Sequence, residues 1–150
     1  MKIVLQRVIR ASVSVEGECC GSCGKGFCLL VGIEKNDTRE DVFYLAQKVV
    51  NLRIFSDENG KMNKSIGDIN GSALIVSQFT LSADCSTGRR PSFTNAGSPE
   101  RAKELFDLFV SSVQEYEIPV QTGIFGAEML VQIENDGPAT FILESQEHEK

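Results

Sequence analysis

The chain has 150 residues, 41% of them hydrophobic, and this length and apolar content predict one domain with a buried core. Its formal net charge of −6 argues against an extended nucleic-acid-binding surface, although a small basic patch for one RNA end stays compatible with it. The apolar runs are too short to span a membrane and the chain opens on a strand-like segment rather than a signal peptide, so we expect a cytoplasmic protein.

The first half of the chain predicts a hairpin, a buried strand and a helix. β-Branched residues recur along residues 2–15 before a turn at Glu16-Gly17, which indicates an opening hairpin. Residues 26–33 form a continuous apolar run, typical of a strand buried on both faces. A helix is expected to begin at Asp37, with Glu40 completing a capping box. Its core-facing side would consist of residues at helical spacing: Val42, Leu45, Ala46, Val49 and Leu52.

The second half predicts strands around a second helix. Residues 52–55 and 73–80 have strand character, whereas 61–71 form an irregular polar connection and 82–97 a long surface loop. Ser98 followed by Pro99 predicts the start of a helix that ends before Pro119. Its apolar face would consist of Ala102, Leu105, Phe106, Phe109 and Val113. Residues 129–133 and 139–143 flank Asn-Asp-Gly, which predicts a closing hairpin.

Together these elements predict an α+β domain over residues 1–145, with a polar tail at 146–150. The sheets would be antiparallel or mixed, with the two helices packed on one side. The sequence contains no repeats and no low-complexity segments.

Histidine and cysteine limit the chemistry that the chain can perform. The single histidine, His148, stands in the polar tail, so a Ser-His-Asp or Cys-His relay cannot be assembled at a rigid site. The odd number of cysteines and their spacing predict free thiols without disulfides. Cys20-x-x-Cys23 matches half of a zinc site but lacks a second pair at similar spacing, so we expect no metal and no cofactor.

Two short motifs carry the functional prediction. The first is Ser77-Gln78-Phe79-Thr80-Leu81, and the second is Asn135-Asp136-Gly137-Pro138-Ala139-Thr140, whose Gly-Pro bond is of the kind that can be cis. Taken alone, the second motif is most often just a turn. Both motifs together, with residues 1–8, 50–55, 60–63 and 90–93, resemble the D-aminoacyl-tRNA deacylase family over almost the whole chain.

The resemblance implies a homodimer whose sheets associate, without a membrane or a further protein partner. The implied substrate is the 3′ acceptor end of D-aminoacyl-tRNA, and mischarged glycine would also be released. Ser77, Gln78 and Phe79 would bind the carbonyl and form the pocket wall. Gly137-Pro138 of one subunit would enter the other subunit's pocket and reject L-amino acids. Arg7 would hold the Gly-Pro segment, and Phe125 and Met129 would line the pocket.

Several assignments leave alternatives open. Thr80 is either a nucleophile or a β-branched core residue, and participation of the ribose 2′-hydroxyl is favoured over Thr80 because the sequence offers no base. Arg89 and Arg90 either bind phosphates of the tRNA or are solvated loop charges, as are the outer candidates Lys61 and Lys64. A non-catalytic nucleic-acid-binding dimer is the main rival function, and a cysteine-based redox or metal protein is a third.

Overall fold

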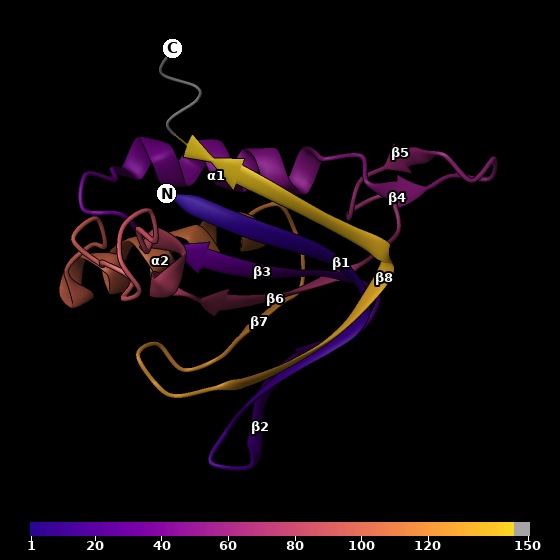
Figure 1. The fold of residues 1–150 in the computed structure, drawn as a ribbon. Helices are drawn as coiled ribbons and strands as arrows, with labels where there is room; N and C mark the ends of the chain where they lie inside the picture. Colours follow the sequence, from indigo (N-terminus) through magenta and orange to yellow (C-terminus); the bar gives the residue numbers. More distant parts are fainter. Residues whose placement is uncertain (146–150) are drawn as a thin grey trace.

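The computed structural model describes residues 1–145, so the polar tail and His148 lie outside the described residues. The elements follow the chain as β1 (Lys2–Val15), β2 (Glu18–Cys23), β3 (Gly26–Gly32), α1 (Arg39–Asn51), β4 (Phe55–Ser56), β5 (Met62–Lys64), β6 (Ser72–Ser77), the 3₁₀ helix η1 (Phe79–Ser82), α2 (Pro99–Gln114), β7 (Val120–Thr122) and β8 (Leu130–Glu144). Figure 1 shows their arrangement.

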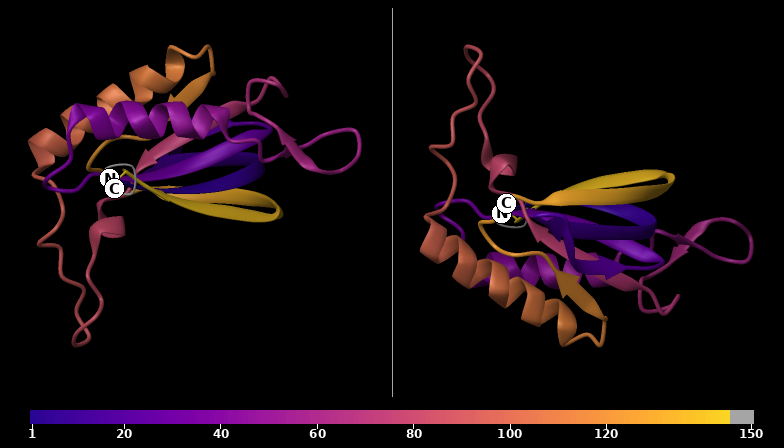
Figure 2. Two further views of the ribbon diagram at one scale, coloured as in Figure 1. Left: turned by 90° about the horizontal axis from the view of Figure 1, so that it is seen from above. Right: turned by 90° about the horizontal axis from the view of Figure 1, so that it is seen from below.

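The main sheet is mixed, with the order β2-β1-β3-β6-β7 and β8 paired to β1. β3, β6 and β7 run parallel, whereas β1 is antiparallel to β2, β3 and β8. Both helices cover the same side of the sheet, as Figure 2 shows from above and below. The predicted α+β class, the mixed sheet and the placement of the helices are therefore confirmed.

The core has two parts, one on each side of β3 and β6. The larger part packs α1 and α2 against side chains such as Phe27, Leu29 and Ile75. The smaller part contains Cys28 and Leu74, which point to the opposite face because strand residues alternate. The second half of β1 also contributes to the smaller part of the core, through Val8, Ala11 and Val13.

The predicted closing hairpin is wrong. β8 is one long strand, and both of its halves pair with β1: Thr140 lies opposite Gln6, and Asn135 lies opposite Val8. Residues 136–139 are therefore extra residues in β8, which we call the Gly-Pro bulge. Pairing with a 14-residue β1 outweighs the local turn signal, because β1 offers a ladder partner to both halves.

The other differences concern element ends. The cap of α1 lies one residue later than predicted, since Thr38 and Asp41 form the capping box. The strand predicted over 73–80 stops at Ser77, and Thr80 belongs to η1. The irregular segment 61–71 contains the short strand β5, which pairs with β4. The apolar face and start of α2 are confirmed, with Ser98 accepting a hydrogen bond from the Arg101 backbone N–H.

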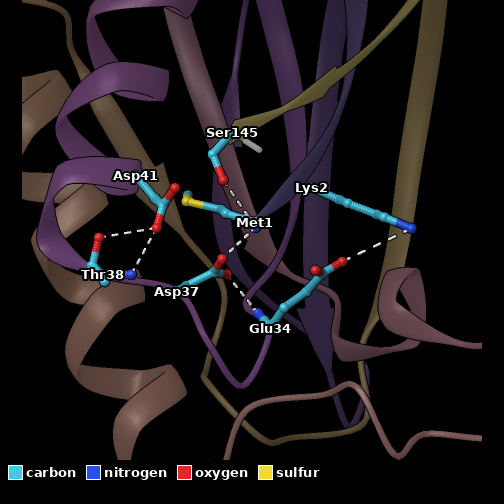
Figure 3. Close-up of polar contacts among 7 residues, drawn as sticks. All are labelled: Met1, Lys2, Glu34, Asp37, Thr38, Asp41 and Ser145. Carbon is cyan, nitrogen blue, oxygen red and sulfur yellow. Dashed lines mark hydrogen bonds and ion pairs between the residues drawn. The ribbon is translucent and has the colours of Figure 1, made fainter. Parts of the chain in front are cut away.

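Asp37 does not cap α1 because its carboxylate accepts hydrogen bonds from two other groups, shown in Figure 3. The Met1 ammonium lies 2.5 Å from Asp37 Oδ1, and the Glu34 backbone N–H lies 2.6 Å from Oδ2. The same ammonium also donates to the Ser145 hydroxyl at 3.1 Å. This cluster joins the first residue of the chain to the start of α1 and to the end of β8.

Asp37→Asn is expected to destabilise the fold by about 3 kcal/mol, because the substitution replaces the carboxylate paired with the buried Met1 ammonium by a neutral amide. The free energy of unfolding in urea measures the effect. Asp107→Asn is the control, since it removes an exposed carboxylate paired with Lys103 and should change stability little. Equal, small effects of the two substitutions would show that the Asp37 ion pair does not stabilise the fold.

No helix within residues 1–145 combines the length and the apolar character needed to cross a bilayer.

Candidate active site

A cavity of about 410 Å³ lies beside the C-terminal ends of β3 and β6. Among the residues singled out in the sequence, Ser77, Gln78 and Phe79 form one wall, and Phe125 and Met129 contribute to another. Ser77 and Gln78 are its only polar side chains among the described residues, and none of its lining residues is charged. The cavity therefore suits a ligand that is held by shape and by a few neutral hydrogen-bonding groups.

The rest of the cavity wall comes from residues that the sequence did not single out. Ala96 and Gly97 end the loop 83–97, and Pro99, Ala102 and Phe106 belong to α2. The loop end is fixed, because Gly97 N–H donates to Ile33 O and Lys35 N–H to Asn95 O, both at 3.0 Å. Small residues carry no chemical signature, and the only clue from the sequence was that Ala102 and Phe106 lie on the predicted apolar face of α2.

The turn after β6 contributes Gln78 and Phe79 to the cavity wall. Gln78 N–H donates to Val31 O at 2.7 Å, which ends the pairing with β3. Phe79 then begins η1, and the first N–H groups of a helix have no partner inside that helix. The last part of the strand predicted over 73–80 is thus replaced by a 3₁₀ turn. Such amides, with the side chains of Ser77 and Gln78, can donate hydrogen bonds to a carbonyl oxygen.

Thr80 lies outside the group of residues that line the cavity. It is exposed, which excludes the core alternative, and its hydroxyl accepts a hydrogen bond from the Gln78 side-chain amide. Thr80 can therefore hold the orientation of Gln78.

For the D-tyrosyl-tRNA hydrolysis that the resemblance implies, Thr80→Val is expected to keep kcat within about threefold of wild type, because the lost hydroxyl contacts Gln78 and lies outside the cavity. Single-turnover kinetics measure the effect. A loss of a thousandfold or more would identify the Thr80 hydroxyl as the nucleophile.

Arg7 holds the Gly-Pro bulge. Its Nε donates to Asp136 O at 3.0 Å, and its Nη1 donates to Ile54 O at 2.7 Å. The Arg7 side chain is mostly buried, whereas Gly137 and Pro138 are exposed, and the peptide bond between them is cis. Asn135 completes the bulge by accepting a hydrogen bond from Ala139 N–H at 2.7 Å.

The bulge and the cavity of one chain lie at different ends of the sheet. Arg7 is opposite Phe27 at the start of β3, whereas Val31 lines the cavity near the end of β3. At about 3.3 Å per residue, this separation along β3 is roughly 13 Å. Neither Gly137 nor Pro138 lines the cavity of its own chain. The structure therefore separates the predicted site residues into a group at the cavity and a group at the bulge, while Thr80, Arg89 and Arg90 belong to neither.

Arg89 and Arg90 are exposed in the outer part of the loop 83–97, which projects from the body in Figure 2. Two backbone hydrogen bonds between Asp84 and Ser92, of 2.8 and 2.9 Å, close this outer part. Neither arginine lines the cavity.

The cysteines lie apart from the cavity. Burial raises the pKa of the Cys23 thiol and raises that of Cys28 to about 12, so both stay protonated at neutral pH. Cys20 is exposed and donates to Glu18 O, whereas Cys23 donates to Phe27 O. All five cysteines are free thiols, and residues 1–145 contain no cluster of three or more His, Cys, Asp or Glu side chains suited to a metal ion.

Comparison with known proteins places the chain among close relatives. The family model described as D-Tyr-tRNA(Tyr) deacylase matches residues 4–144. D-aminoacyl-tRNA deacylases are 55% identical in Clostridium perfringens, covering 99% of both chains, and 53% identical in Fervidobacterium nodosum, covering 97% of this chain and 98% of the relative. A third, from Persephonella marina, is 56% identical and covers 97% and 99% of the two chains.

Two solved structures share the fold. A c-Myc DNA unwinding element binding protein superposes with a TM-score of 0.90 at 42% identity, covering 96% of this chain and 98% of its own. A probable eukaryotic D-amino acid tRNA deacylase superposes with a TM-score of 0.79 at 18% identity, covering 95% and 97%.

Proposed function

Because the chain belongs to the D-Tyr-tRNA(Tyr) deacylase family, a family of enzymes, we propose that the cavity binds the 3′ end of D-aminoacyl-tRNA and that the ester to the amino acid is hydrolysed there. The proposal rests on one observation: Ser77, Gln78 and Phe79 lie together at an apolar cavity that has no charged lining residue. The activity removes D-amino acids, and also mischarged glycine, from cytoplasmic tRNA and so proofreads translation.

In the proposed reaction the protein supplies position and hydrogen bonds rather than a base. The ester carbonyl accepts hydrogen bonds from the turn around Gln78 and Phe79, which stabilise the negative charge that develops on its oxygen. Water attacks the carbonyl carbon, and the ester bond to the ribose 3′-oxygen breaks. Since no lining side chain can act as a general base, the terminal ribose 2′-hydroxyl relays a proton from the water to the leaving 3′-oxygen. Placement of an already labile ester supplies much of the acceleration.

Selectivity is proposed to come from a second subunit. The exposed Gly-Pro bulge of one subunit enters the partner's cavity, where its carbonyl oxygens accept hydrogen bonds from the α-ammonium group of the amino acid. A side chain in the L configuration would meet Pro138 of the partner subunit. The bulge is exposed and held by Arg7 at a distance from its own cavity, which supports action on another subunit.

The open face of the sheet supports the proposed homodimer. Val4 pairs with Ile142 on one side and with Leu30 on the other, so their side chains form an apolar row on the face away from the helices. Ile142 is 73% exposed. A second copy covering this row would remove its apolar surface from water.

The test is release of amino acid from matched D- and L-tyrosyl-tRNA, with a chelator present and with Pro138→Ala alongside. We expect D-selective hydrolysis by the wild type and reduced selectivity in the variant, which lacks the exposed ring. Equal hydrolysis of both esters by the wild type would refute chiral proofreading.

A non-catalytic nucleic-acid-binding dimer is the second candidate. One structural neighbour is named for binding a DNA unwinding element. Failure of the folded dimer to hydrolyse either ester, together with binding of nucleic acid, would favour this candidate.

A further inference from the structure

Phe79 and Phe93 form an exposed aromatic pair at the edge of the cavity. Their ring centroids lie 5.2 Å apart and their planes are tilted by 55°. Phe79 is 61% exposed and Phe93 is 40% exposed, although Phe79 also lines the cavity. Contiguous apolar surface that stays exposed on a folded domain often marks a place where a ligand or a partner binds.

The backbone fixes the position of Phe93. Ser92, the preceding residue, exchanges two hydrogen bonds with Asp84, and Phe93 O accepts a hydrogen bond from Ala96 N–H at 3.1 Å. Phe79 is fixed by η1, which follows β6 directly. The two rings are thus held between the cavity and the outer loop that carries Arg89 and Arg90.

We propose that Phe79 and Phe93 form a stacking platform for an unpaired base of the tRNA 3′ end, the base that precedes the terminal adenosine. The inference rests on the proposed function, in which the terminal aminoacyl-adenosine occupies the cavity. The next nucleotide then leaves the cavity beside Phe79. Aromatic side chains stack on unpaired bases without regard to sequence, which suits an enzyme that acts on many tRNAs.

Charge on the same loop favours RNA as the occupant. Arg89 and Arg90 lie four and three residues before Phe93, and both are exposed. A backbone that leads from the cavity past the aromatic pair would bring its phosphates toward these two guanidinium groups. An apolar protein surface would offer these two guanidinium groups no negative charge to pair with.

The test compares two substrates that share the ester but differ in the nucleotide that precedes it: D-tyrosyl-tRNA and D-tyrosyl-adenosine. Phe93→Leu is expected to raise KM for the tRNA about tenfold, with kcat unchanged, and to leave both constants for the adenosine ester as in wild type. Phe93→Tyr should restore wild-type KM. Phe43→Leu, which removes a ring of similar exposure on α1, is the matched control.

Equal changes on both substrates, or no change on either, would overturn the platform. So would weaker dimerisation of Phe93→Leu in sedimentation, because the ring would then be covered by the partner. A binding measurement separates this inference from the proposed reaction. RNA hairpins that carry no amino acid are the ligands, one with and one without a single-stranded 3′ overhang. Wild type should bind the hairpin with the overhang about tenfold more tightly, whereas Phe93→Leu should bind the two hairpins almost equally, even if no ester is hydrolysed.

Discussion

Gly137→Ala is expected to lower the ratio of D- to L-tyrosyl-tRNA hydrolysis at least about tenfold, because a methyl group at this position displaces the bulge that is proposed to exclude L-amino acids. A Cβ atom on Gly137 would lie 2.7 Å from Arg7 Nη2, and Cβ atoms in proteins almost never come this close to another heavy atom. The φ of +130° at Gly137 is also unfavourable for alanine. Either the bulge or the Arg7 side chain must move.

Single-turnover hydrolysis of the two esters measures this ratio. Gly17→Ala is the matched control, because Gly17 has a φ of +84° in the β1–β2 turn but a Cβ atom added there would meet no other atom within 4 Å. That control is expected to lose some stability and to keep its D/L ratio. A wild-type ratio in a folded Gly137→Ala protein would show that the bulge geometry does not determine selectivity.

Elements whose signals are local could be predicted from the sequence. The second helix needed only Ser98, Pro99 and an apolar residue at each turn, all within α2 or next to it. The opening hairpin and β3 likewise depend on patterns within a few residues. These elements are found in the folded protein as predicted, because tertiary packing and local preference favour the same structure.

Features that depend on distant partners could not be predicted. The Asn-Asp-Gly signal of residues 135–137 favours a hairpin, yet β8 stays extended because β1 pairs with both of its halves. Asp37 and Thr38 both fit the capping pattern, and the choice depends on the Met1 ammonium, which binds Asp37. Neither competing partner is visible in the local sequence.

The candidate site divides in the same way. Ser77 and Gln78 were singled out for their polar side chains and Met129 by the family resemblance, and the structure places all three at the cavity. Gly97 and Ala102 were not predicted, because their contribution is the space that their small side chains leave open. The resemblance to a family identified Arg7, whereas its bond to Ile54 O became apparent only in the fold.

Ala102→Trp is expected to reduce kcat/KM for D-tyrosyl-tRNA about a hundredfold or more, since the indole would occupy space in which the substrate must be placed. Ala102 is only partly exposed and also packs against the main core, so we expect the larger side chain to lower the free energy of unfolding by about 1–3 kcal/mol, and urea unfolding checks that the variant stays folded. Glu104→Trp, at an exposed position of the same helix, is the control and should stay active. Full activity of a folded Ala102→Trp protein would place the reaction outside this cavity.

Mixing the two variants tests whether the bulge acts across subunits. A dimer of one Ala102→Trp subunit and one Gly137→Ala subunit contains one open cavity, and that cavity belongs to the subunit with the altered bulge. If the bulge serves the partner's cavity, the open cavity receives the intact bulge, and D-selective hydrolysis should return at about half the wild-type rate. If the bulge serves its own cavity, no site is intact, and selectivity should stay as low as in Gly137→Ala alone. The heterodimer therefore separates the two arrangements, which activity measurements on either single variant cannot do.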